Sequence, residues 1–177
     1  MKKTPFILLI AIFFLSSCDL LSDLTQFDLP YEKTVSIPIV AASDSILNIA
    51  TPSINTGISA AMDNYNTGLD LIDEISLTSM TLTLTSPAGG DLGFLSTIAV
   101  YINTTGQEEI QLAYDTDVAA DVGAVLELST STADIQDYIK SDDFSLRFEL
   151  GTDETVLEEH VITMNMVTHV DARVLGL

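Results

Sequence analysis

The sequence predicts an all-β fold: an antiparallel β-sandwich of immunoglobulin-like or other Greek-key layout, with one or two short helices. Apolar and polar residues alternate in many short segments, which is the pattern of half-buried strands. Clusters of Gly, Pro, Asn, Asp and Ser separate these segments at regular intervals. Roughly seven to nine strands with such turns are typical of a sandwich, with a closed barrel as the alternative.

The first strand is predicted at 34–39, where Val35, Ile37 and Ile39 alternate with polar residues and with Pro38. Because proline has no N–H to donate to a ladder, this strand is expected at a sheet edge or with a bulge. A second short strand is expected at 46–50.

Residues 53–70 leave two interpretations open. Ile58, Ala61, Met62 and Tyr65 have the spacing of one helix face, but the surrounding residues are rich in Asn, Thr, Ser and Gly, which favours a loop. A long excursion of this kind is often where a protein binds its ligand.

The strand expected at 75–85 changes the face of its apolar residues part-way. Such a change of phase predicts a β-bulge or bend near Thr78 and Ser79. Residues 94–102 are apolar on both faces and indicate a central strand, and residues 110–114 alternate again. Together the three segments suggest an antiparallel meander.

A short strand is expected at 122–128, followed by a helix that begins near Ser131, with Asp134 as an acid in its first turn. Residues 144–150 form the cleanest alternating strand of the chain. The final strand pattern, over 162–174, exceeds the usual strand length of about 5–6 residues, so it is expected to bend or to be split.

The N-terminus has the pattern of an export signal. Lys2 and Lys3 precede an uncharged, nearly all apolar run over 5–15. A run of about 11 residues is too short to cross a bilayer core of about 30 Å, but it suits the apolar part of a secretory signal.

The run leads directly into Leu15-Ser16-Ser17-Cys18, and Cys18 is the only cysteine of the sequence. This arrangement resembles the lipobox of bacterial lipoproteins, and the resemblance covers residues 1–18. It implies that the signal ends at Ser17 and that Cys18 carries the lipid. The expected location is therefore the cell envelope, anchored to a bacterial membrane on its periplasmic or surface side. Asp19 resembles the inner-membrane retention signal of enterobacterial lipoproteins, and the choice of membrane stays open.

These boundaries divide the chain into a signal at 1–17, a lipidated tether at 18–30 and one β-sandwich domain at 31–177. The net charge is −20, with 26 acidic residues against six basic ones. Such a field opposes binding to nucleic acid and to anionic lipid. The acids are spread along the chain, as on a solvated surface.

Sequence motifs for catalysis are weak. The two histidines, His160 and His169, have an odd separation, so on one regular strand they point to opposite faces. A histidine-based triad or a paired-histidine metal site is therefore hard to build. Asp142-Asp143 and Asp153-Glu154 have the character of turn and cap residues.

The best metal candidate is a calcium site formed by Asp115, Asp117 and Asp121, because calcium takes 6–8 oxygen ligands. The pattern is incomplete, since Ala119 and Ala120 stand where a calcium loop has a third acid and a glycine.

The sequence therefore favours a non-enzymatic binding or structural module. Such a module presents loops 53–70 and 115–121 to a protein or a glycan of the envelope. The alternative is a calcium-dependent or carboxylate-based hydrolase.

Overall fold

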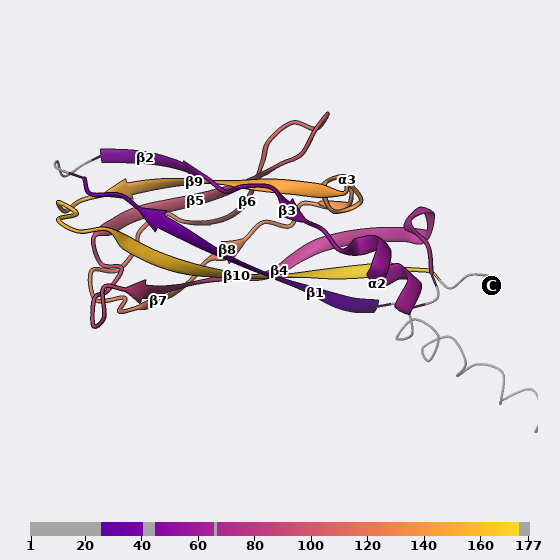
Figure 1. The fold of residues 1–177 in the computed structure, drawn as a ribbon, viewed down its shortest axis with the longest axis horizontal. Coiled ribbons are helices and arrows are strands. Elements are labelled where there is room, and N and C mark those ends of the chain that lie inside the picture. The colour runs from indigo at the N-terminus through magenta and orange to yellow at the C-terminus, as the bar shows by residue number, and fades with distance from the viewer. Residues whose placement is uncertain (1–25, 41–44, 66, 174–177) are drawn as a thin grey trace, which may run out of the picture.

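The computed structural model describes residues 26–40, 45–65 and 67–173. Two antiparallel sheets pack face to face along the length of the molecule (Figure 1). One sheet has the strand order β1-β10-β4-β7. The other has the order β2-β9-β5-β6-β8, and β3 pairs with β9 as well. The prediction of an all-β sandwich with short helices is confirmed.

The elements of the described chain are short helices and strands of very different length. The strands are β1 (Gln26–Ile37), β2 (Ser45–Ala50), β3 (Ile54–Asn55), β4 (Ile72–Ser86), β5 (Leu95–Asn103), β6 (Ile110–Asp115), β7 (Val125–Glu127), β8 (Ser129–Thr130), β9 (Asp143–Thr152) and β10 (His160–Ala172). The helices are α2 (Ile58–Asn64), the 3₁₀ turn η1 (Leu69–Leu71) and α3 (Gln136–Ile139). No helix among the described residues is long and apolar enough to span a bilayer.

The first strand begins earlier than predicted. The pairs between β1 and β10 run without interruption from Gln26↔Asp171 to Ile37↔His160. The tether expected at 18–30 is therefore too long at its C-terminal end, because residues 26–30 belong to the sheet. Ile39 is 64% exposed and lies outside the strand. The prediction of an edge strand is confirmed, since β1 ends the order of its sheet.

The predicted bulge in β4 lies at Thr78. Val167 of β10 pairs with Ser79 and Thr168 pairs with Leu77, which leaves Thr78 as the extra residue. Its hydroxyl donates to the carbonyl of Val167 at 3.0 Å. The bulge lets apolar residues on both sides of it face the core, although their spacing in the sequence changes phase.

The meander predicted for β4, β5 and β6 is wrong. β4 and β5 lie in different sheets, so the chain crosses the sandwich at the turn between them. Only β5 and β6 form the expected hairpin, and a register irregularity at Leu112 makes both Leu112 and Ala113 buried. Alternation within a strand defines its buried face, but it does not say which sheet the strand joins.

The core lies between the two sheets and is continuous along the sandwich. The alternation predicted for 144–150 is confirmed, because Phe144, Leu146, Phe148 and Leu150 of β9 are all buried. The final strand pattern is not split as expected: it forms one uninterrupted strand, β10, with every second residue from Ile162 to Ala172 buried. The bulge lies in its partner strand, β4.

The two helices differ in how well the sequence predicted them. In α2 the helical interpretation is confirmed: Ile58 and Met62 are buried, and the ring of Tyr65 stacks on Phe27 at 4.1 Å.

The helix expected from Ser131 begins only at Gln136. The residues before the helix bond to β4 instead. The Ile135 N–H donates to Ile75 O, and Asp134 Oδ1 accepts the Ile75 N–H. The Ser131 hydroxyl accepts only the Ala133 N–H, so it does not cap the helix.

Tyr31 of β1 joins the first strand to the opposite sheet and to the segment that follows β3. Its hydroxyl donates to Thr56 O at 2.8 Å, and its ring meets Phe144 edge to face at 5.2 Å. Burial raises the pKa of Tyr31 to about 12, from an ordinary value near 10. The folded protein thus holds the phenol neutral where an unfolded chain ionises it.

Stability should fall as the pH rises from about 10 to about 12, because the folded state keeps its proton in this range and the unfolded state loses it. The loss from Tyr31 amounts to about 2–3 kcal/mol. Tyr31→Phe should cost about 1 kcal/mol at neutral pH and should lose most of this alkaline decline. Urea unfolding between pH 7 and 12 measures both. An alkaline decline of full size in the variant would assign it to other groups.

Candidate functional site

Three adjoining hollows form an open, polar depression at the end of the sandwich where α2 and α3 lie. Its walls are segments 53–60, 103–105 and 141–145, and we call it the polar groove. Asp142 lies between the first and second hollows, and Thr104, Thr105 and Asp143 lie between the second and third. Hydroxyl, amide and carboxylate groups dominate the lining.

The groove is built by hydrogen bonds between segments that are distant in sequence. Thr56 N–H donates to Asp142 O at 3.1 Å, and the Thr56 hydroxyl donates to Ser141 O at 2.8 Å. The side-chain amide of Asn55 also donates to Asp142 O, at 3.2 Å. On the other side, the Thr104 hydroxyl donates to Asp143 O at 2.8 Å. The main chain of Asp142 and Asp143 is thus held from two sides.

The carboxylates of Asp142 and Asp143 are exposed and available to a ligand. Within the described residues, all bonds to these two positions go to their backbone carbonyls, and no ion pair involves either side chain. Lys140 is close in sequence, but its ammonium donates to Gln136 Oε1 at 2.6 Å. The groove therefore offers acceptors without a competing cation on its walls.

The sequence prediction located part of this site and missed the rest. Segment 53–60 belongs to the predicted binding region 53–70. Asp142 and Asp143 have only the character of turn residues in the sequence, and loop 103–105 has no motif. The other predicted binding loop, 115–121, lies at the opposite end of the sandwich, where Val118 N–H donates to Ser96 O at 3.0 Å.

Asp115, Asp117 and Asp121 are not gathered into a metal site. Asp115 Oδ1 accepts the Asp117 N–H at 3.0 Å, so this carboxylate stabilises its own turn. Among residues 26–40, 45–65 and 67–173, no three Asp, Glu, His or Cys side chains are grouped to hold a metal ion. Calcium binding by this loop stays a prediction without a geometric counterpart.

The two histidines lie nine positions apart on β10 and make separate contacts. His160 Nδ1 contacts Glu158 O at 2.9 Å, and its ring lies 4.6 Å from that of Phe94. His169 Nδ1 lies 2.8 Å from Asp28 Oδ1, in a cross-strand pair with β1. Neither contact involves a hydroxyl or thiol that the histidine could activate as a nucleophile.

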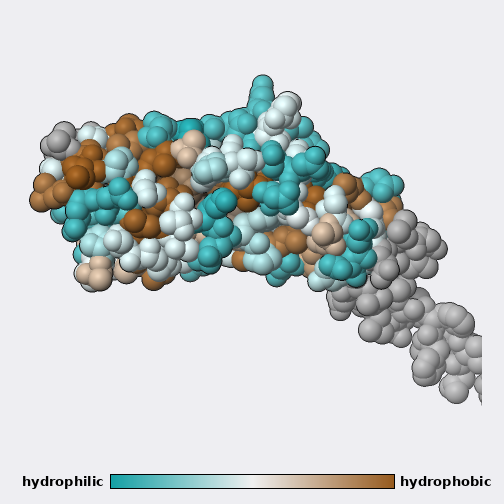
Figure 2. Space-filling model, viewed as in Figure 1, coloured by the Kyte–Doolittle hydropathy of each residue, from teal (hydrophilic) through white to brown (hydrophobic). Residues whose placement is uncertain are grey.

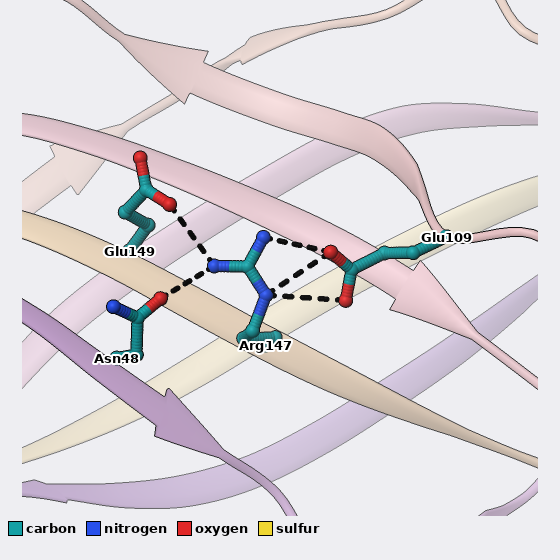
Figure 3. A network of polar contacts seen from close by, with 4 residues as sticks. All are labelled: Asn48, Glu109, Arg147 and Glu149. Carbon is teal, nitrogen blue, oxygen red and sulfur yellow. Dashed lines mark hydrogen bonds and ion pairs between the residues drawn. The ribbon is translucent and has the colours of Figure 1, made fainter.

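Arg147 of β9 is the centre of a polar network on the outer face of its sheet (Figure 3). Its guanidinium bonds Glu109 through Nη2 at 2.7 Å, Glu149 at 3.0 Å and Asn48 Oδ1 at 2.6 Å. It also lies 4.2 Å above the ring of Tyr101, its cross-strand partner. The bond to Glu109 is the main reason that the pKa of Arg147 is raised further. Each of the three guanidinium nitrogens bonds a protein group, so the network joins strands rather than recruits an anion.

Hydrophobic surface gathers at the end of the sandwich where β2 begins, away from the polar groove (Figure 2). Exposed apolar residues in or next to the strand ends here include Ile39 at 64%, Ile46 at 71%, Val125 at 53% and Leu157 at 81%. The bridge Val40↔Val156 is antiparallel, so Ile39 and Leu157 are neighbours across it. Exposed apolar residues that cluster are typical of contact surfaces.

Comparison with known proteins gives no family. No protein-family model and no curated protein matches the chain. A crystal structure of the decameric BFDV capsid protein aligns over 82% of this chain and 99% of its own, with 8% identity and a TM-score of 0.34. Turnip yellow mosaic virus aligns over 85% and 98%, with 10% identity and a TM-score of 0.27. Likenesses this weak carry no argument about function.

Arg147→Gln should lower the free energy of unfolding by about 1 kcal/mol, because it leaves Glu109 and Glu149 without their shared cation. Raising the salt concentration should reduce the difference. Arg173→Gln is the matched control, since Arg173 pairs with Asp73 at a more exposed position and should change little. Urea unfolding of both variants is the measurement, and equal losses would contradict a special role for the Arg147 network.

Proposed function

We propose that this chain is a lipid-anchored module of a bacterial cell envelope that binds a glycan at the polar groove without catalysis. The observation that carries the binding part is the pair of exposed, unengaged carboxylates of Asp142 and Asp143 among hydroxyl and amide groups. The export signal and the lipobox resemblance carry the anchoring part.

A glycan suits this lining better than an apolar ligand does. Sugar hydroxyls donate and accept hydrogen bonds in pairs. Carboxylates accept two or more such bonds, and asparagine amides both donate and accept. Phe144 lies on one wall but is only 1% exposed, so it offers no ring for stacking. Recognition therefore depends on hydrogen bonds to Asp142, Asp143 and their neighbours.

Anchoring through Cys18 would keep the groove near the membrane. The chain between Cys18 and Gln26 spans at most about 29 Å when fully extended. Gln26 pairs with Asp171, at the end of the sandwich that also holds α2 and the groove. Two or more acyl chains are needed for stable attachment, and mature bacterial lipoproteins usually carry that number.

The alternative function, a calcium-dependent or carboxylate-based hydrolase, has less support. Asp115, Asp117 and Asp121 form no ligand group in the described chain. Asp142 and Asp143 are adjacent in sequence on one wall of the groove, whereas glycoside hydrolysis needs two carboxyl groups on opposite sides of the scissile bond. Turnover of a bound glycan remains the result that would favour the enzyme.

Titration with a panel of glucan, glucosamine and N-acetylglucosamine oligosaccharides, followed by NMR shifts, tests the binding. At least one class should shift resonances of 53–60, 103–105 and 141–145. The double variant Asp142→Asn, Asp143→Asn should weaken that binding about tenfold or more, which corresponds to about 1.4 kcal/mol.

Asp115→Asn with Asp117→Asn is the control, because it removes the same charge at the other end of the sandwich. Equal weakening in both double variants would show general attraction to an acidic surface and would contradict the groove. Absence of any shift across the panel would contradict glycan binding at the polar groove. Product formation would replace the binding module with the hydrolase.

A further inference from the structure

The free edge of β2 differs from the other sheet edges of the described chain. Exposed strand edges invite pairing with other chains, and proteins usually protect them with short strands, charges or proline. β7 has three residues and β8 has two. β1 is long, but it carries Pro30 and Lys33. β2 has six residues, Ser45–Ala50, with neither charge nor proline.

The backbone of β2 alternates between its partner β9 and the open side. Thr51 N–H donates to Leu146 O at 2.8 Å and the Leu146 N–H donates to Thr51 Oγ1 at 2.9 Å, so position 51 bonds β9 and not the open side. The register from Ala50↔Arg147 to Ser45↔Thr152 continues without a shift. Because hydrogen-bonded pairs alternate in antiparallel sheets, residues 47 and 49 bond β9. The N–H and C=O groups of residues 46, 48 and 50 therefore point to the open edge.

We propose that β2 pairs with β2 of a second copy of this chain, antiparallel, about a two-fold axis at Asn48. This register places Ile46 opposite Ala50 of the second copy, Leu47 opposite Ile49, and Asn48 opposite Asn48. All three outward-pointing residues, 46, 48 and 50, then lie in hydrogen-bonded pairs. The two sheets join into one that continues across the axis.

The sequence of β2 is self-complementary in this register and in no neighbouring one. The apolar residues Ile46 and Leu47 face apolar residues of the second copy, and Asn48 faces the same asparagine of that copy. An axis at Leu47 would place Ile46 opposite Asn48. An axis at Ile49 would place Ile46 opposite Pro52, which has no N–H to donate. A contact between identical strands is therefore favoured over a foreign strand.

Charge also permits this contact. Glu149 neighbours Asn48 in β9, and three strand spacings, about 14 Å, separate it from Glu149 of the second copy. That distance exceeds the screening length of about 8 Å at physiological salt. Arg147 neighbours Ala50, which faces Ile46 and beyond it Gly151 of the second copy. No like charges face each other, although the net charge of −20 opposes association at low salt.

Five paired residues cover much less than the roughly 800 Å² per partner of a standard interface. Association is therefore weak, and a covalent trap is the suitable probe. In the full-length chain, Asn48→Cys places two thiols at the axis. Leu157→Cys is the control, because Leu157 is 81% exposed and lies outside β2, in the segment between β9 and β10. The unsubstituted chain, oxidised in the same way, measures any dimer that forms through Cys18.

Oxidation of Asn48→Cys should give at least tenfold more disulfide-linked dimer than Leu157→Cys, and more at 0.5 M than at 0.05 M salt. Adding Ile46→Lys should abolish the product, whereas adding Leu157→Lys should leave it unchanged. Thermal unfolding checks that each variant is folded.

A second pair of variants, Ile46→Cys and Ala50→Cys, tests the register without changing Asn48. A mixture of the two chains should crosslink, and each chain alone should not. Equal yields from Asn48→Cys and Leu157→Cys, or crosslinking that survives Ile46→Lys, would overturn the proposal.

Discussion

The pairing of β1 with β10 is the constraint on which the arrangement of this molecule depends. It joins the first described residue, Gln26, to the last strand over twelve residue pairs without a register shift. Tyr31 continues this connection to the other sheet through Thr56 and Phe144. The place where the chain enters the domain is thus fixed relative to α2 and the polar groove, and the apolar surface lies at the far end.

Local patterns in the sequence were sufficient for the fold class and for several details. The phase change of apolar residues predicted the bulge at Thr78, because only an extra residue can return both halves of β4 to one core. Strict alternation predicted β9, and helical spacing supported one of the two interpretations left open for 53–70, the helix that α2 confirms. These predictions rest on short-range periodicity, which a strand or helix imposes whatever its neighbours are.

Long-range pairing explains what the sequence did not predict. Asp28 and Pro30 interrupt the apolar pattern of β1, so the strand was placed too late, although β10 supplies partners for all of 26–37. The crossing between β4 and β5 and the late start of α3 likewise depend on contacts with distant strands. The polar groove combines three segments that are distant in sequence, and the hydrogen bonds of Asn55, Thr56 and Thr104 to the main chain of 141–143 bring them together.

The proposed lipid at Cys18, together with the firmly paired β1, would hold the groove end near the membrane and the apolar end away from it. β1 alone is about 40 Å long. A lipidated Cys18 leaves an introduced cysteine as the single free thiol, so a dye at Asn64→Cys or Leu157→Cys reports each end. In vesicles that carry a headgroup quencher, the dye at 64 should be quenched strongly and the dye at 157 weakly. Equal quenching at both positions would contradict this orientation, and no association with the vesicles would contradict the lipid anchor.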